Sequence, residues 1–423
     1  MPESNRTETP SILRNISWFT GASALVKPAW FIFITAFCMR ILGVGGYGLM
    51  NAALSFMIIA VSFSDLGTNP YTIREVARNR NLASRYFSNI FLTRLLLAIV
   101  ACLVAWLVAW QLGYDRTELA TLLAAALYAG TLRLLEFCRT FYRAFEVLQF
   151  EAVSILVEKV MVIIGGTAML WYTRSPAGTL LGMGVAMLGA LMLNVVWIHR
   201  RLAVLKLRLI SWRFIRVVIA AAIPLGLYAL FNRTYFRIGV VILESLGGAE
   251  AAGIYGVAFR IIEALQLLPM VVVAAILPRL SRLYHQSDYT NFERLLGRSL
   301  LAAGSLALIG ATVLSIWGPD VVQLLDGRPQ FFPAGALLQF LIWVFPLMTI
   351  NHLLTATLIA TDRQKPLAGI FGCIVILNPA LNVILIPHFS YYGAATALLV
   401  SEGAILAACS AIFFHIRRSW RSS

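Results

Sequence analysis

The sequence predicts an all-α polytopic membrane protein with about twelve transmembrane helices in two pseudo-symmetric six-helix lobes around a central cavity. Three observations lead to this fold class. The 423 residues are 60% hydrophobic and only 13% charged, which is more apolar surface than a soluble domain can use. Twelve apolar segments are long enough to cross a bilayer. One segment pattern occurs twice, about half a chain apart, which predicts two similar halves in tandem.

The twelve segments follow one another with short connections, and each has the ~20 residues that cross a hydrocarbon core. They are Ile16–Met39, Gly46–Leu66, Ser88–Trp110, Leu119–Phe141, Val153–Tyr172, Thr179–Ile198, Val217–Leu243, Gly253–Leu277, Ser299–Trp317, Phe331–Ala360, Leu367–Pro387 and Tyr391–Phe414. We therefore expect lobes at 16–198 and 217–414, a linker at 199–216, and terminal segments at 1–15 and 415–423.

The repeat is carried by five residues that recur at a constant offset of 208. Gly45, Tyr47, Gly48, Pro70 and Arg74 correspond to Gly253, Tyr255, Gly256, Pro278 and Arg282. They lie at the ends of matching apolar segments, where helix breakers and charges set topology. Parallel halves of this kind build transporters around a central site.

The distribution of Lys and Arg predicts the orientation in the membrane. With the N-terminus inside, 23 cations fall in inside segments and 4 in outside segments, a strong positive-inside signal. Both termini are therefore expected to be cytoplasmic. The net charge of +15 is explained by topology, so we expect no nucleic-acid partner.

The linker at 199–216 is the longest inside connection and carries six basic residues. Its alternation of leucines and cations suits an amphipathic helix on anionic membrane lipids, which are expected partners. A solvated linker is the equal alternative.

Seven cations remain inside the apolar segments, namely Lys27, Arg94, Arg133, Lys159, Arg233, Arg237 and Arg260. Each costs at least ~2.5–3.5 kcal/mol at a helix centre and needs a partner or water. Arg133 and Arg260 each have a glutamate three residues later on the same helical face. Arg94 is expected to reach the cytoplasmic end of its helix. Lys159 follows Glu158 directly, so the two side chains should point to different faces.

Lys27, Arg233 and Arg237 have no acid three or four residues away, so we expect them to lack an acidic partner in the protein. The repeat offset maps Lys27 onto Tyr235, between the two arginines, and so predicts cations at equivalent depth on the first helix of each lobe. Arg260, oriented by Glu263, is expected to join them. Cations in a cavity imply an anion as substrate, and the planar fork of arginine suits a phosphate or diphosphate.

The sequence contains no nucleotide-binding or hydrolase motif, and its five cysteines are scattered. We therefore predict no enzyme activity, no catalytic residue, no cofactor and no metal site. Transport would draw on an ion gradient, the membrane potential or the substrate gradient. Asp65, Glu263 and Glu402 are candidates for ion coupling, although Asp65 is better explained as a helix-terminus cap in Asp65-Leu66-Gly67.

Several stretches resemble the polysaccharide biosynthesis, or Wzx-type oligosaccharide flippase, family of the MOP superfamily. The most specific runs from Gly253-Ile254-Tyr255-Gly256 through Arg260 to Leu277-Pro278-Arg279-Leu280-Ser281. The others include Gly45-Gly46-Tyr47-Gly48, Ser64-Asp65-Leu66-Gly67 and Tyr142-Arg143-Ala144-Phe145-Glu146. The resemblance implies a twelve-span, two-lobe flippase that moves polyprenyl-diphosphate-linked oligosaccharide from the cytoplasmic to the outer leaflet by alternating access through a cationic cavity. It also implies the inner membrane of a bacterium as the location, and other polysaccharide-assembly membrane proteins as partners.

Three other functions are alternatives to a flippase. A MATE-type ion-coupled antiporter of small molecules shares the fold but more often places acids in its cavity. A membrane-embedded ligase or polymerase usually needs a large outside loop, which is lacking here. A scaffold for glycan assembly would leave the intramembrane cations unexplained.

Overall fold

The computed structural model describes residues 30–421, and in this range it consists of helices without a strand. Eight helical stretches are long and apolar enough to cross a membrane, or nine when α11 (Phe332–Leu341) and α12 (Val344–Ala360), bent by 49°, form one span. Three of these stretches are divided by a residue with positive φ, at Gly43, Gly248 and Ser390. Twelve helical segments result, so the prediction of a polytopic all-α membrane protein with about twelve helices is confirmed.

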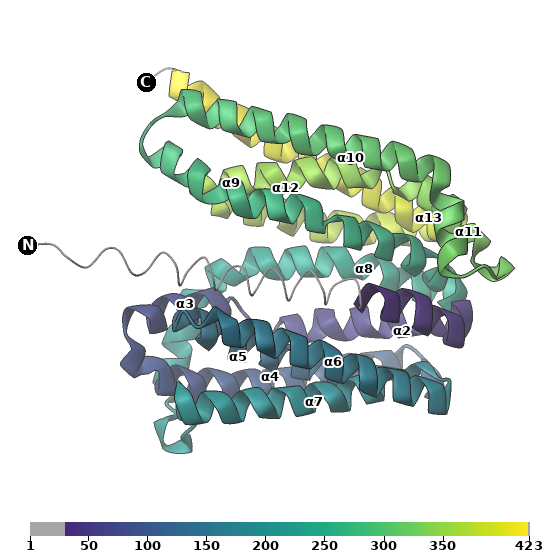
Figure 1. Ribbon diagram of the computed structural model, residues 1–423, viewed down its shortest axis with the longest axis horizontal. Coiled ribbons are helices and arrows are strands. Elements are labelled where there is room, and N and C mark those ends of the chain that lie inside the picture. The colour runs from purple at the N-terminus through teal and green to yellow at the C-terminus, as the bar shows by residue number, and fades with distance from the viewer. Residues whose placement is uncertain (1–29, 422–423) are drawn as a thin grey trace, which may run out of the picture. The chain divides into compact units, whose positions relative to one another are not determined.

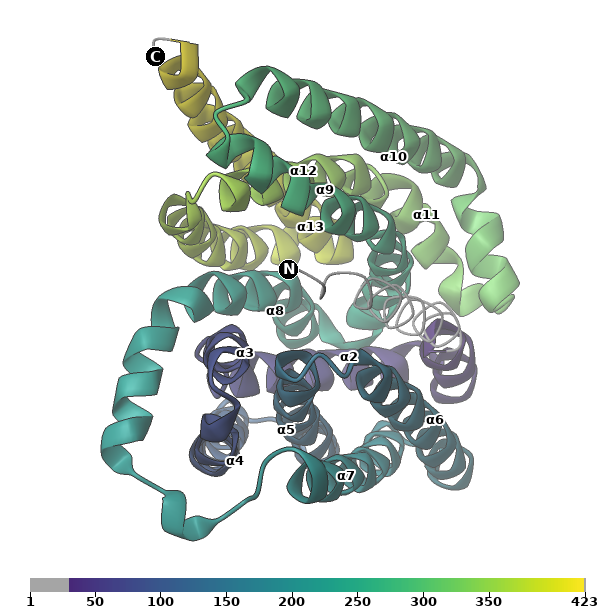
Figure 2. The same ribbon diagram turned by 60° about the vertical axis from the view of Figure 1, so that its left-hand side comes forward.

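The helices form two compact units (Figures 1 and 2). Unit 1 contains the described residues up to Gly43 and Ala53–Leu230, and unit 2 contains Val44–Ala52 and Phe231 onward. Two helices, α2 and α8, therefore contribute residues to both units. The lobe bounds expected from the repeat, 16–198 and 217–414, remain a prediction.

Unit 1 is a bundle in which α5 packs against α4, α6 and α7, and α6 packs against α7. Its elements are η1 (Phe33–Phe37), most of α2 (Cys38–Ser62), α3 (Thr68–Arg78), η2 (Arg80–Leu82), α4 (Ala83–Gln111), α5 (Arg116–Ala144), α6 (Leu148–Thr173), α7 (Pro176–Arg201), η3 (Leu207–Leu209) and the start of α8. A capping box of Asp115 and Glu118 begins α5, and the side chain of Ser175 caps α7.

Unit 2 places α12 against α9, α10 and α13. Its elements are the remainder of α8 (Trp212–Leu265), α9 (Leu267–His285), α10 (Tyr289–Leu325), η4 (Pro329–Phe331), α11 (Phe332–Leu341), α12 (Val344–Ala360) and α13 (Gln364–Arg421). Residues 44–52 of α2 belong to this unit because two glycines allow a very close helix approach. A Cβ on Gly48 would lie 1.8 Å from Ala249 O, and one on Gly253 would lie 2.2 Å from Val44 O. The two copies of the repeated glycine motif thus pack on each other.

The linker is not an amphipathic helix, so that interpretation is wrong. Between the end of α7 and the start of α8 the chain has only the single turn η3. Its backbone is held by side chains of α4 instead. Ser84 Oγ and Ser88 Oγ accept from the amides of Val204 and Lys206 at 2.9 Å each. Asn89 donates to Leu209 O at 2.8 Å and accepts from the amide of Ser211 at 2.7 Å. We call residues 202–211 the strap.

Candidate functional site

Two predicted site arginines share one carboxylate in unit 2. Arg260 Nη1 donates to Glu263 Oε2 at 2.8 Å, one turn away on the second segment of α8. Arg237 Nη2, from the first segment, lies 3.3 Å from Glu263 Oε1. The break at Gly248 makes this possible, because it brings two segments of one continuous stretch together. The structure therefore brings two predicted substrate-binding residues, Arg237 and Arg260, together with Glu263, a candidate for ion coupling.

The cluster contains one residue that sequence reasoning missed. Arg260 Nη2 donates to Asn51 Oδ1 at 2.9 Å, and Asn51 Nδ2 donates to Tyr47 O at 3.1 Å. Asn51 lies one turn after Gly48, in the α2 segment that packs against α8. The sequence signal for this residue is an asparagine within an apolar segment. Polar side chains in a membrane face protein or water rather than lipid, so such a residue is a candidate for a site.

The expectation that Arg237 lacks an acidic partner is wrong. Glu263 lies 26 residues later, and a search at helical spacing of three or four residues cannot find a partner on another segment. Two guanidinium groups nevertheless contact one carboxylate, so Arg237, Arg260 and Glu263 together carry a net positive charge. A local excess of positive charge is a suitable electrostatic environment for an anion.

The other two predicted cations are placed differently. Arg233 lies four residues before Arg237 and is partly buried. Lys27 lies outside the described residues. Tyr235, onto which the repeat maps Lys27, is buried and donates from its hydroxyl to Glu402 Oε1 at 2.8 Å. It therefore points away from the face shared by the two arginines, as expected from its position between them.

Glu402 on α13 is a buried carboxylate with neutral donors. Besides Tyr235, Asn351 of α12 donates from Nδ2 to Glu402 Oε2 at 2.6 Å. These partners of Glu402 could not be predicted from the sequence, because Tyr235 and Asn351 lie on distant helices. The Oδ1 atom of Asn351 is itself buried without a hydrogen-bond partner. A buried carboxylate beside a spare oxygen offers ligands for a proton or a small hard cation.

Asp65 in unit 1 has a different environment from Glu402. Its carboxylate accepts from Arg94 Nη2, and Arg94 Nε also donates to Thr68 Oγ1 at 2.8 Å. The Arg94 side chain is only 2% exposed. The expectation that Arg94 reaches the cytoplasmic end of its helix is therefore wrong. The interpretation of Asp65 as a helix cap is also wrong, because the N-cap of α3 is Gly67, without a side-chain cap bond.

A second group of ion pairs in unit 1 surrounds Glu158. Lys159 Nζ lies 2.8 Å from Glu158 Oε1, and Arg139 Nη2 donates to Oε2 at 2.5 Å. The expectation that adjacent residues would point apart is wrong here, because the flexible lysine stem bends back. The predicted pair of Arg133 and Glu136 is confirmed at 2.6 Å. These ion pairs form within unit 1, as expected of structural charges.

Among residues 30–421, no group of three or more His, Cys, Asp or Glu side chains is arranged to hold a metal ion.

The sequence matches the family model described as "polysaccharide biosynthesis protein" over residues 12–284, more than half of the chain. The chain belongs to the polysaccharide biosynthesis protein family. The resemblance seen in the sequence motifs is thereby confirmed. The MatE family model also matches, over residues 224–384.

One curated protein with a similar sequence is the "Probable flippase AglR" of Haloferax volcanii. It is 30% identical over 179 residues, which are 41% of this chain and 37% of the relative. The chain thus matches little more than a third of that relative's length.

Solved structures share the fold of this polysaccharide biosynthesis protein at low identity. An inward-facing multidrug resistance MATE family transporter of the MOP superfamily has a TM-score of 0.68 at 14% identity and covers 95% of each chain. The MATE multidrug transporter DinF-BH has a TM-score of 0.67 at 16% identity, covering 99% of this chain and 98% of its own. The lipid II flippase MurJ has a TM-score of 0.66 at 12% identity, covering 93% and 88%. The chain therefore shares its fold with these transporters.

Proposed function

We propose that the protein is a flippase that moves a polyprenyl-diphosphate-linked oligosaccharide from the cytoplasmic to the outer leaflet of the inner membrane of a bacterium. The two halves would alternate access to a cationic cavity, with both termini cytoplasmic and with other polysaccharide-assembly membrane proteins as partners. Family membership supports a role in polysaccharide biosynthesis. The names of a curated relative and of one structural neighbour, both flippases, support lipid translocation.

The observation that carries the substrate class is the cluster of Arg237, Arg260 and Glu263. Two guanidinium groups meet at one carboxylate, so positive charge exceeds negative charge among these three residues, and arginine binds phosphate oxygens in two-point contact. The diphosphate group supplies several such oxygens. Arg233 and Lys27 would add to the positive field, and the cations would separate or become hydrated as the halves move.

Glu402 supports a role in ion coupling. Among the carboxylates expected to couple, Asp65 and Glu263 already face arginine, whereas Glu402 accepts from neutral groups. We propose that Glu402 takes up a proton or Na⁺ and that Asp65 serves structure. Binding would change the charge buried between α8, α12 and α13, and so favour one conformation over the other.

A MATE-type antiporter of small molecules is the second candidate, because the fold neighbours include multidrug transporters. The excess of arginine over acid in the cluster disfavours a cationic drug.

The two functions are separated by reconstituting the purified protein in liposomes. One set carries a fluorescent polyprenyl-diphosphate oligosaccharide, whose leaflet is assigned by quenching from outside. The other set carries a fluorescent organic cation and a proton or Na⁺ gradient. We expect lipid translocation without cation export. Cation export without lipid translocation would overturn the proposed flippase and favour the antiporter.

A further inference from the structure

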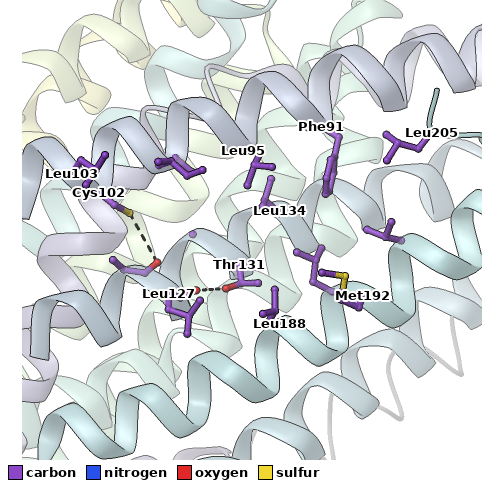
Figure 3. A pocket seen from close by; sticks show the side chains of 16 residues that line it. Phe91, Leu95, Cys102, Leu103, Leu127, Thr131, Leu134, Leu188, Met192 and Leu205 are labelled. Carbon is purple, nitrogen blue, oxygen red and sulfur yellow. Dashed lines mark hydrogen bonds between the residues drawn. The ribbon is translucent and has the colours of Figure 1, made fainter. Parts of the chain in front are cut away.

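An apolar groove runs along unit 1 between α4, α5 and α7 (Figure 3). Its wall from α4 includes Phe91, Leu95 and Leu103, and its opposite wall includes Leu134 and Leu188. The rim is open, since Leu103 and Met192 keep 54% and 55% of their surfaces exposed. In a membrane protein such a groove faces lipid rather than water, so a hydrocarbon chain is its natural content.

The length of the groove matches one leaflet. From Phe91 to Leu103 the helix rises about 18 Å at 1.5 Å per residue, close to the ~15 Å that is half of a hydrocarbon core. Its volume is about 540 Å³, room for about 18 methylene groups at roughly 30 Å³ each, the share of one water molecule in the liquid. That is one ordinary acyl chain, and much less than a long polyprenyl chain.

The charge at one end of the groove indicates the head group. Leu205 of the strap lines the groove, and the amide of Lys206 is fixed to Ser88, one turn before Phe91. Lys206 and Arg208 are exposed, and the side chains of Arg200 and Arg201 at the end of α7 add positive charge. This end lies on the side that the distribution of Lys and Arg predicts to be cytoplasmic. Basic residues at this level attract anionic head groups.

We propose that this groove is a binding site for an anionic phospholipid of the cytoplasmic leaflet. One acyl chain lies between α4, α5 and α7, and the phosphate lies against Lys206 and Arg208. The strap hydrogen bonds to α4 hold these cations at the mouth of the groove. The site is separate from the arginine cluster of unit 2 and does not depend on the proposed flippase activity. Its occupant is a resident lipid rather than the transported one.

The test is native mass spectrometry of the purified protein equilibrated in detergent with phosphatidylglycerol and phosphatidylcholine of equal chain length. Wild type should retain phosphatidylglycerol preferentially. In Lys206→Gln/Arg208→Gln the preference should fall about 25-fold, because each cation contributes roughly a factor of five, from ~1 kcal/mol each. Arg298→Gln, an exposed cation on α10, is the control and should leave the preference unchanged.

A second variant tests the groove itself. A Cβ on Gly130, which lines the groove, meets no atom within 4 Å, so Gly130→Leu should fill the space without a clash and reduce retention of both lipids at least ten-fold. Gly304→Leu on α10 is the matched control, because a Cβ there also meets no atom within 4 Å. Both replacements raise helix propensity alike.

Three results would overturn the proposal. Wild-type lipid retention by folded Gly130→Leu would show that no chain enters the groove. An unchanged preference in the Lys206/Arg208 variant would remove the head-group contact. Displacement of phosphatidylglycerol by equimolar polyprenyl phosphate would make the transported lipid the occupant instead of a resident phospholipid.

Discussion

The buried pair of Arg94 and Asp65 allows a quantitative prediction of stability. The Arg94 side chain is 2% exposed and that of Asp65 is 8%, so removing one partner leaves an uncompensated charge in the interior of unit 1. Removing one partner of such a pair typically lowers the unfolding free energy by roughly 3–5 kcal/mol. We expect Arg94→Met and Asp65→Asn each to lose this amount. The double variant removes both charges and should lose less than either single variant, about 1–3 kcal/mol.

The assay is equilibrium unfolding of the purified protein in mixed micelles with a rising fraction of sodium dodecyl sulfate. Arg74→Met is the control, because the pair of Arg74 and Glu75 is exposed, with 53% and 23% of the side chains accessible. Its loss should be at most about 1 kcal/mol. Additive losses in the double variant, or a loss below about 1 kcal/mol in both single variants, would refute the assignment of a buried, coupled pair.

Three further predictions follow from named contacts. Gly48→Ala should lower the unfolding free energy by roughly 1–3 kcal/mol or more, since the new methyl group would lie 1.8 Å from a backbone oxygen. Gly45→Ala is the control and should leave the unfolding free energy unchanged, because a Cβ there meets no atom within 4 Å. Both variants are measured by the same unfolding assay. Glu402→Gln should abolish the dependence of lipid translocation on a proton or Na⁺ gradient while leaving lipid binding intact; translocation that follows the gradient as in wild type would contradict coupling there. Asn89→Ala should lower the unfolding free energy by roughly 1–3 kcal/mol, because it removes the hydrogen bonds that hold the strap. Equilibrium unfolding measures this loss, and hydrogen exchange of the Ser211 amide should become faster. Thr93→Ala is the control and should leave that exchange rate unchanged, because it loses only a bond to its own helix.

The fold could be predicted largely from the sequence because the bilayer imposes its own length and polarity on every span. Apolar runs gave the helices, and the repeated glycine motif anticipated two related segments. The direct contact between these motifs could not be predicted from the sequence. It depends on how the helices pack, because Gly48 and Gly253 let two helix backbones approach closely.

The candidate site could be predicted only in part, because helical spacing reveals partners on one helix and hides those on another. Arg260 and Glu263 were paired correctly for this reason. Glu263 and Asn351 lie on other segments, so spacing along one helix reveals neither the acidic partner of Arg237 nor the donor to Glu402. The same limitation concealed the pair of Arg94 and Asp65. Lys27 lies outside the described residues and stays a prediction.

The most direct test of the proposed anion site is the translocation rate of a polyprenyl-diphosphate oligosaccharide in liposomes for Arg237→Gln/Arg260→Gln. These replacements remove both positive charges while Glu263 keeps hydrogen-bond donors. We expect at least a hundred-fold slower translocation than wild type, with the protein folded and reconstituted equally, and no change for Arg298→Gln. A rate within a factor of two of wild type would contradict the claim that these arginines carry the diphosphate across the membrane.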